Sequence, residues 1–318
     1  MINLKASAAA PEGFSLKQVV KTARSLSEPY RINSGSGFRL KDFDPADTND
    51  FTAESKPDLQ QALSIGVGAL AELQEMLYAH GRWAVLLIFQ AMDAAGKDSA
   101  IKHVMSGVNP QGCQVTSFKA PSDEELGHDF MWRCHKGVPE RGRIGIFNRS
   151  YYEEVLVVRV HPELLPAQKI PDSLIGKRIW DDRLEDIRGF ERYLSRNGVV
   201  VRKFFLHISW QEQRRRFLER LEKPEKHWKF SASDIREREH WKDYMAAYEQ
   251  TIRHTASKDA PWYVVPADKK WFTRVIVAAA VIDALASLDL RYPPVGEDKR
   301  AEFAAAKRAL LADERAPR

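Results

Sequence analysis

The chain has 318 residues, of which 44% are hydrophobic and 29% are charged, and Lys plus Arg outnumber Asp plus Glu by 49 to 44. This mixture is typical of a globular protein with a hydrophobic core, and it excludes disordered, collagen-like and coiled-coil chains. A net charge of +5 is compatible with nucleic acid, an acidic membrane surface or a polyanionic substrate as a partner, so charge alone does not choose among them.

Three features bear on the compartment. Cys113 and Cys134 are the only cysteines, and two isolated thiols favour a reducing environment over a disulfide scaffold. The first 17 residues lack the long apolar segment of a signal peptide. The most apolar stretch, residues 275–288, is interrupted by Asp283 and is shorter than the ~18 residues that a membrane span requires. We therefore expect a soluble, cytoplasmic protein.

The chain alternates between apolar runs and amphipathic segments. Residues 1–56 are polar and are predicted to form an extended, partly ordered arm, whereas leucines at helical spacing predict a helix over 57–81 that ends at Gly81. Short apolar runs, typical of strands buried on both faces, occur at 83–89, 113–118, 143–147, 199–208 and 262–266. Further helices are expected at 122–136, 172–196, 210–222, 234–257 and 271–288.

Strands that alternate with helices predict an α/β fold with a doubly wound parallel sheet of about five strands. We expect residues 57–295 to form this domain. Residues 296–318 are rich in Ala and charged side chains and predict a helical tail.

The segment that follows the first buried strand is the most informative motif. It reads QAMDAAGKDSAIKHV over residues 90–104, with the small residues Ala94, Ala95 and Gly96 directly before Lys97. In a phosphate-binding loop, backbone N–H groups at a helix N-terminus and a neighbouring lysine bind phosphate oxygens. The pattern therefore predicts a phosphate loop here.

The motif departs from the Walker A consensus GxxxxGK[ST] at two positions. Ala91 stands in place of the first glycine, and Asp98 stands in place of the Ser or Thr that binds Mg²⁺. Asp93 and Asp98 flank Lys97, and carboxylates are hard oxygen ligands that suit Mg²⁺. A surface turn with a capping aspartate and an exposed lysine is the alternative interpretation.

A second cluster of polar residues follows the strand at 143–147. The sequence continues with Asn148 and Arg149, and Glu153 comes one turn later. Because open α/β sheets bind ligands at the carboxyl ends of their strands, Arg149 is a candidate phosphate ligand and Glu153 a candidate metal ligand. A helix-capping asparagine followed by solvated glutamates fits the spacing equally well.

Residues 210–242 are basic and largely helical. In kinases a mobile lid carries arginines over the transferring phosphate and excludes water, which gives Arg216, Arg220 and Lys229 a role in binding a polyanion. Pairs such as Glu212 with Arg216 at i,i+4 also fit an ordinary solvated face. Elsewhere, Arg133 in DFMWRCH either clamps a phosphate or caps its helix.

With these motifs in place, the chain resembles the polyphosphate kinase 2 family, and specifically its class III branch. The resemblance runs in order over residues 57–294. It rests on the stretches QAMDAAGKDSAIKHV, SGVNPQGCQVTSFKAP, HDFMWRCHKGVPERGRIGIFNRSYYEEVLVVRVHPELLP, WDDRLEDIRGFERYLSRNG, HWKFSASDIREREHWKDYMAAYEQ and APWYVVPADKKWFTRVIVA.

The resemblance implies a three-layer P-loop kinase fold with a helical lid at about 210–242. It implies that inorganic polyphosphate is the donor, that AMP and ADP are acceptors with ADP and ATP as products, and that the protein is a homodimer or homotetramer. Nucleic acid and membrane are not expected as partners. It also accounts for the unusual loop and for Asn148 with Glu153, which class III members carry where other classes end the strand in Asp.

Together, the motifs and the resemblance predict an active site with four kinds of residue. The catalytic residues are Asp93, Lys97, Arg149 and Glu153; the nucleotide phosphates contact Ala94, Ala95, Gly96, Lys97, Asp98, Arg133 and Asn148; polyphosphate contacts Lys102, Arg216, Arg220 and Lys229; and Mg²⁺, or alternatively Mn²⁺, binds Asp93, Asp98 and Glu153. An ATP-dependent kinase and a non-catalytic nucleotide or polyanion sensor are the two alternative functions.

Overall fold

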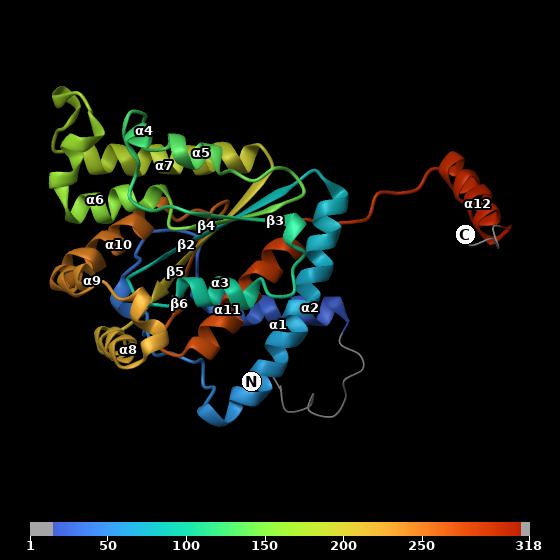
Figure 1. Ribbon diagram of the computed structural model, residues 1–318, viewed down its shortest axis with the longest axis horizontal. Coiled ribbons are helices and arrows are strands. Elements are labelled where there is room, and N and C mark those ends of the chain that lie inside the picture. The colour runs from blue at the N-terminus through green and yellow to red at the C-terminus, as the bar shows by residue number, and fades with distance from the viewer. Residues whose placement is uncertain (1–14, 313–318) are drawn as a thin grey trace.

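The computed structural model describes residues 15–312 and places a six-stranded sheet between two layers of helices (Figure 1). The strands are β1 (Arg31–Ile32), β2 (Ala84–Ala91), β3 (Cys113–Ser117), β4 (Ile144–Asn148), β5 (Val199–His207) and β6 (Trp262–Pro266). Their order across the sheet is β1-β6-β5-β2-β4-β3. β1 is antiparallel to β6, and the other neighbouring pairs are parallel.

The centre of the sheet explains the apolar runs in the sequence. β2 lies between β4 and β5, with Leu87 opposite Ile146 on one side and Arg202 on the other. Residues 84–90 are all buried, as expected for a strand covered by helices on both faces. The predicted α/β fold is confirmed, and its parallel strands coincide with the apolar runs.

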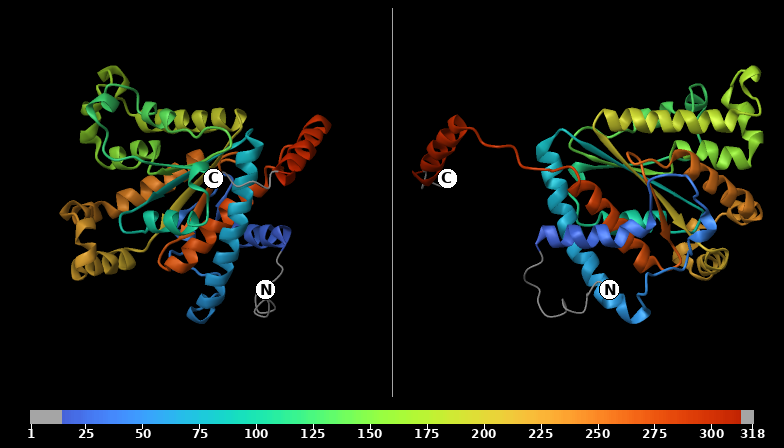
Figure 2. Two further views of the ribbon diagram at one scale, coloured as in Figure 1. Left: turned by 45° about the vertical axis from the view of Figure 1, so that its right-hand side comes forward. Right: turned by 180° about the vertical axis from the view of Figure 1, so that it is seen from behind.

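Helices cover both faces of the sheet (Figures 1 and 2). One layer contains α1 (Leu16–Ser27), α2 (Lys56–His80), α3 (Lys97–Val104) and α11 (Lys270–Ala286), and the other contains α4 (Asp123–Leu126), α5 (Trp132–Lys136), α6 (Val157–Val160), α7 (Ile179–Arg196) and α10 (Trp241–Thr255). Gly81 ends α2 in the left-handed conformation, with φ +62°, as its position in the sequence predicts.

Several predicted helices are shorter than expected or interrupted. Residues 122–136 form two short helices, α4 and α5, because a capping box between Ser122 and Glu125 starts a single turn that Gly127 ends. The segment 234–257 is divided in the same way, into α9 (Ala232–Glu237) and α10 with a 3₁₀ turn between them. Apolar periodicity continues across such breaks, so it predicts the buried face but not the interruptions.

The predicted extended arm at 1–56 is wrong for the part that the structure describes. Ser15 caps α1 with a capping box to Gln18, and α1 packs against α2 and α11. Nε of Arg24 contacts Oδ1 of Asp283 at 2.7 Å, and β1 extends the sheet. The polar composition does not predict α1, because only a narrow face of this helix is buried. Residues 1–14 lie outside the described part of the chain.

Two segments project from this body. The predicted lid consists of α8 (Trp210–Glu222), the 3₁₀ turn Pro224–Lys229, α9 and the 3₁₀ turn Arg238–His240. The predicted tail helix is present as α12 (Glu297–Ala312), which stands apart at the end of an extended connection and has no buried residue (Figures 1 and 2). No helix within residues 15–312 is both long and apolar enough to span a membrane.

Candidate active site

The predicted phosphate loop, residues 92–96, joins the carboxyl end of β2 to the start of α3. Ala94 has φ +61° and Gly96 has φ +102°. The left-handed region is unfavourable for a residue with a Cβ, so the conformation of Ala94 must be held by its surroundings. The first N–H groups of a helix have no partner within the helix, and α3 therefore presents such donors beside the loop.

Lys97, the first residue of α3, belongs to a group of charged side chains around the loop. Its Nζ atom donates to the carbonyl oxygen of Ala91 at 3.0 Å. Burial and then the charge of Arg149 lower the pKa of Lys97, whereas the carboxylates of Asp93 and Glu153 oppose that shift. In this environment Lys97 can exchange its acceptor, the Ala91 carbonyl, for phosphate oxygens.

The turn that follows β4 lies against the loop. Nδ2 of Asn148 donates to Oδ1 of Asp98 at 2.8 Å, which ties the two segments together. The N–H of Arg149 donates to the carbonyl oxygen of Phe89 at 3.1 Å. Arg149 has φ +64°, so it is a second residue of this site with a Cβ in the left-handed region.

The Arg149 guanidinium lies between two carboxylates from different segments. Nη2 is 3.2 Å from Oδ1 of Asp93, and Nη1 is 3.7 Å from Oε2 of Glu153. Glu153 raises the pKa of Arg149 most strongly. Burial raises the pKa of Glu153, although Arg149 and Lys97 act in the opposite direction. The structure thus brings together the four residues that the sequence nominated as catalytic.

These carboxylates suit a divalent cation of the kind used in phosphoryl transfer. Among the described residues no group of three or more His, Cys, Asp or Glu side chains is arranged to hold a metal by itself. Mg²⁺ is usually bound by one or two carboxylates, with phosphate oxygens and water as the remaining ligands. Asp93 and Glu153 flank one guanidinium and fit such a partial site, whereas Asp98 bonds to Asn148 beside it.

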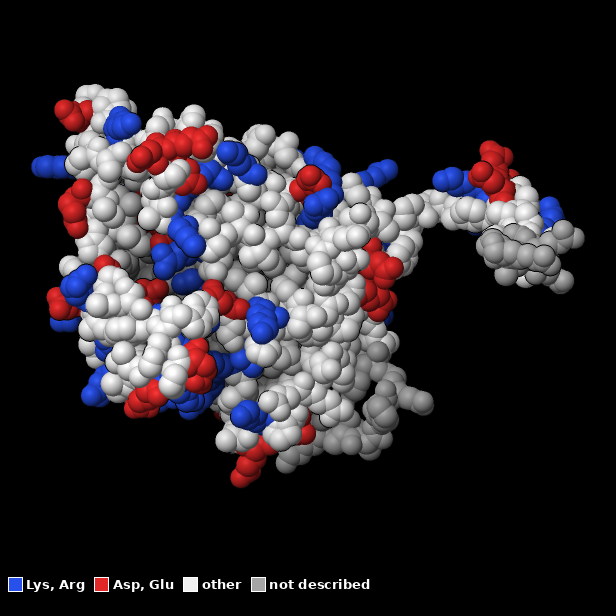
Figure 3. Space-filling view, in the orientation of Figure 1, with Lys and Arg blue, Asp and Glu red and all other residues white. Residues whose placement is uncertain are grey.

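A cavity of about 480 Å³ lies in front of the phosphate loop. Its cationic lining residues come from the loop, from the strand ends and from the lid: Lys97, Lys119, Arg149, Arg216, Arg220, Lys226, Lys229 and Lys270. Figure 3 shows Lys and Arg side chains gathered around the hollow beside the lid. We call this space the basic cavity.

Three of these cations were absent from the predicted site, namely Lys119, Lys226 and Lys270. Lys119 follows β3 and Lys270 follows β6. The rule that ligands bind at the carboxyl ends of parallel strands, applied to every strand, could have identified both. Lys226 lies in the lid beside the predicted Lys229.

Arg216 occupies a different position from the one its sequence context suggests. It is only 4% exposed, and its Nη1 donates to the carbonyl oxygens of Ala94 at 3.0 Å and Ala95 at 2.8 Å. Nη2 donates to the carbonyl of Ala267 at 2.6 Å, and Nε contacts Glu212 at 2.7 Å. The guanidinium is thus engaged by the phosphate loop itself, which it holds in place from the lid side.

The other predicted polyphosphate residues divide into two groups. Arg220 and Lys229 line the basic cavity, and Nη1 of Arg220 donates to the Lys229 carbonyl at 3.3 Å. Lys102 lies exposed in the last turn of α3 and is not among the residues that line this cavity. A role for Lys102 stays a prediction.

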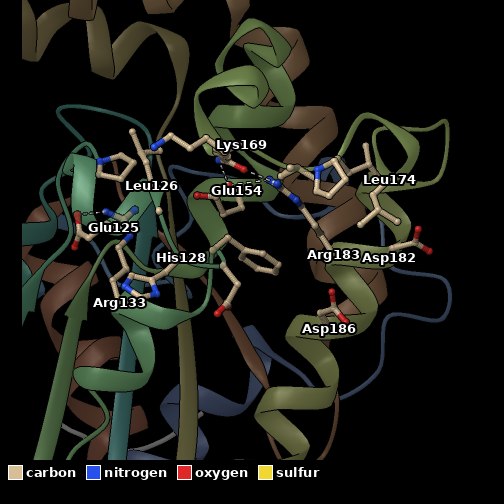
Figure 4. A pocket seen from close by; sticks show the side chains of 18 residues that line it. Glu125, Leu126, His128, Arg133, Glu154, Lys169, Leu174, Asp182, Arg183 and Asp186 are labelled. Atoms are coloured by element: carbon tan, nitrogen blue, oxygen red, sulfur yellow. Dashed lines mark hydrogen bonds and ion pairs between the residues drawn. The ribbon is translucent and has the colours of Figure 1, made fainter.

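Arg133 lines a second cavity, of about 520 Å³, between the α4–α5 region and α7 (Figure 4). We call this space the second cavity. Its walls include the apolar side chains of Leu126, Phe130, Ile170, Leu174 and Ile179. Buried Arg183 points into it and donates to Oε2 of Glu154 at 2.7 Å. Nη1 of Arg133 donates to the carbonyl of Lys119 at 2.8 Å.

The walls of the two cavities adjoin where Arg133 contacts the segment that follows β3. Glu153 contacts Arg149, which lines the basic cavity, and the next residue, Glu154, lines the second cavity. Lys119 and Arg133, which share a hydrogen bond, line one cavity each. The two spaces therefore have neighbouring walls, and Arg149 belongs to the basic cavity.

A phosphate loop after a central strand of a mostly parallel sheet, facing a cation-lined cavity under a helical lid, defines a P-loop kinase-like protein. The family model of polyphosphate kinase 2 (PPK2) matches residues 53–292, and the chain belongs to that family.

Known relatives agree with this assignment. An ADP-polyphosphate phosphotransferase of Rhodopseudomonas palustris is 50% identical over 286 residues, which cover 90% of this chain and 98% of the relative. An AMP/ADP-polyphosphate phosphotransferase of Meiothermus ruber is 45% identical over 264 residues, which cover 83% of this chain and 94% of the relative. The crystal structure of polyphosphate kinase 2 from Arthrobacter aurescens TC1 superimposes with a TM-score of 0.82 at 42% identity and covers 90% of this chain and 98% of that one.

Proposed function

We propose that this protein is an enzyme that transfers phosphoryl groups from inorganic polyphosphate to AMP and ADP, forming ADP and ATP. The observation that carries the proposal is the basic cavity over the phosphate loop, in a chain whose family and relatives bear the names of polyphosphate phosphotransferases. Both AMP and ADP are included because the relative from Meiothermus ruber is named for both acceptors.

The charge of the basic cavity favours polyphosphate as its occupant. Lysines and arginines from the loop, the strand ends and the lid face this space together, and only Asp93, Asp98 and Glu219 among its lining residues are acidic. A chain of phosphates carries a charge on every unit, so it can use cations distributed along the whole cavity. A compact nucleotide would leave the cations of the lid without a phosphate to bind.

The second cavity suits the nucleoside part of the acceptor. Its apolar walls can cover a base, and its polar groups can bind ribose hydroxyls or the base edge. With the nucleoside there, we place the terminal phosphate toward Arg149 in the basic cavity. This arrangement differs from the sequence-based prediction, in which the phosphate loop held the acceptor phosphates.

Catalysis in this arrangement depends on positioning and charge. The acceptor oxygen attacks the terminal phosphorus of polyphosphate in line, and the bond to the next bridging oxygen breaks. Lys97, Arg149 and the loop N–H groups stabilise the negative charge on the transferring group. Asp93 and Glu153 would hold a divalent cation, which would supply positive charge that neutralises part of the charge of the phosphates. Mg²⁺ is the first choice and Mn²⁺ the alternative.

The test is an assay with purified protein, Mg²⁺ and polyphosphate, with AMP in one series and ADP in another, in which ADP and ATP are quantified by chromatography. We expect product from both acceptors and a matching shortening of polyphosphate. A parallel series with ATP and AMP, without polyphosphate, tests an ATP-dependent kinase. No product from either acceptor with polyphosphate would contradict the proposal.

A further inference from the structure

A buried ion pair lies beneath the turn after β4. Lys203 on β5 is fully buried, and its Nζ atom lies 2.5 Å from Oε2 of Glu191 on α7, which is 2% exposed. The same Nζ donates to the carbonyl of Thr255 at 2.8 Å. Well-packed apolar residues often stabilise a core as well as a buried ion pair does, so stability alone is a weak reason for these charges.

Two tyrosine hydroxyls connect this pair to the active site. Tyr151 donates to Oε1 of Glu191 at 3.0 Å, and Tyr152 donates to the same atom at 2.6 Å. Lys203 donates in turn to the hydroxyl of Tyr152 at 3.2 Å. Burial raises the pKa of both tyrosines well above the ordinary value, so both stay protonated and act as donors.

These tyrosines lie between the two active-site residues of the turn. Arg149 lines the basic cavity and contacts Glu153, whereas Tyr151 and Tyr152 begin the 3₁₀ turn Tyr151–Val155 and extend into the core. Arg149 has φ +64°, and a residue with a Cβ keeps that conformation only where its surroundings fix it. The hydrogen bonds to Glu191 fix the chain directly after Arg149.

We propose that Glu191 and Lys203 are positioning residues for phosphoryl transfer, which act through the hydroxyls of Tyr151 and Tyr152 to hold Arg149 and Glu153 against the phosphate loop. This inference rests on the roles proposed above for Arg149 and Glu153. It goes beyond them because Glu191 and Lys203 touch no substrate.

The first test removes one hydroxyl and keeps the ring. Tyr152→Phe should lower kcat at least about tenfold, because displacement of a catalytic group by 1 Å can cost on the order of 10²-fold. The KM for polyphosphate should stay within about twofold, since the lid cations are untouched, and the Mg²⁺ concentration for half-maximal activity should rise because Glu153 is displaced. Tyr30→Phe is the matched control: Tyr30 is also buried, and it loses a hydroxyl bond of 2.7 Å to Asp47 near β1. It should leave kcat unchanged.

The second test is a double-mutant cycle. Glu153→Gln should lower kcat, and Tyr152→Phe added to it should cost less than the roughly tenfold that it costs alone, because part of the effect of Tyr152 is exerted through Glu153. Additive losses contradict the proposal, because they show that Tyr152 acts on another group. Circular dichroism and the unfolding midpoint verify that each variant folds. Tyr151→Phe replaces Tyr152→Phe if the latter does not fold.

The outcomes separate this inference from the proposed roles of the site. Reduced kcat in Glu153→Gln with unchanged kcat in Tyr152→Phe overturns the positioning role alone. Wild-type kcat in Glu153→Gln overturns the role proposed for Glu153 and this inference with it. Reduced kcat in both, with a non-additive cycle and an unaffected Tyr30→Phe, supports the inference.

Discussion

The phosphate loop after β2 and the turn after β4 lie side by side at the carboxyl edge of the sheet, yet they are held in opposite ways. The loop consists of small residues, and side chains from the lid support it: Arg216 donates to the Ala94 and Ala95 carbonyls, and Gln213 donates to the Asp93 carbonyl at 2.9 Å. The turn carries its own anchors, because Tyr151 and Tyr152 extend into the core.

The difference follows from what each segment offers a substrate. Where backbone N–H groups bind phosphate, side chains must be small, and support has to come from outside the segment. Where side chains such as Arg149 bind the substrate, neighbouring residues in the same segment are free to anchor it. Each segment holds one residue with a Cβ in the left-handed region, Ala94 or Arg149, so both need that support.

The largest effect is expected at Lys97, the residue beside the loop whose side chain contributes directly. Lys97→Ala should lower kcat by at least about 10²-fold, because it removes a charge that stabilises the transferring phosphoryl group. Steady-state rates of ATP formation from ADP and polyphosphate measure this. Near-normal turnover would show that the loop works through its backbone alone.

The support from the lid can be tested with two neighbouring arginines that share one carboxylate. Arg216→Ala should reduce the free energy of unfolding by about 3 kcal/mol, because it removes a buried partner of Glu212 and of the loop carbonyls. It should also lower kcat, since the phosphate loop loses its hydrogen bonds from Arg216. Urea denaturation and steady-state rates measure the two effects.

Arg215→Ala is the matched control for that change. Nε of Arg215 contacts Glu212 at 2.6 Å, but the side chain is 60% exposed. A surface pair of this kind contributes at most about 1 kcal/mol. Equal losses of stability in the two variants would mean that the loop contacts of Arg216 contribute little.

The decrease of kcat at acidic pH should depend on Glu153 in the turn after β4. Because burial raises the pKa of Glu153, its carboxylate is lost on acidification at a higher pH than that of an exposed glutamate. We expect kcat to fall with decreasing pH through that raised pKa and Glu153→Gln to remove this limb while lowering the plateau. An unchanged acid limb in Glu153→Gln would assign it to another group.

The smallest effect is expected from backbone strain in the loop. Ala94→Gly should raise the free energy of unfolding by up to about 1 kcal/mol, because glycine adopts a positive φ without a steric penalty. Ala95→Gly serves as the comparison, since Ala95 is not among the residues with positive φ. It should lose about 0.5–1 kcal/mol through the added entropy of the unfolded chain. Equal effects of the two changes would argue against strain at Ala94.

The sequence predicts local features of this protein better than features that depend on distant contacts. The apolar runs and the GK motif are local, so the parallel strands and the phosphate loop follow from them. The rule for strand ends correctly brings Asp93 near Arg149. The hydrogen bonds from Arg216 to the loop carbonyls depend on how α8 packs against the loop. The i,i+4 spacing of Arg216 and Glu212 in the sequence does not predict these bonds.

The residues that support the turn after β4 are equally difficult to predict from the sequence. Glu191 and Lys203 belong to α7 and β5, and each alone reads as an ordinary charged residue. Their burial appears only when the helix packs on the sheet. The sequence also does not predict β1, because a strand of two residues shows no periodicity. Its pairing partner, β6, lies more than two hundred positions away in the chain.

In the proposed function, polyphosphate occupies the basic cavity and the nucleotide occupies the second cavity, with transfer beside Arg149. Kinetics of Lys229→Ala and Phe130→Ala, with polyphosphate and ADP each varied in turn, test it most directly. We expect Lys229→Ala to raise the KM for polyphosphate and to leave the KM for ADP unchanged, and we expect Phe130→Ala to raise only the KM for ADP. If Phe130→Ala raises the KM for polyphosphate, or Lys229→Ala raises that for ADP alone, the assignment of the two cavities is wrong.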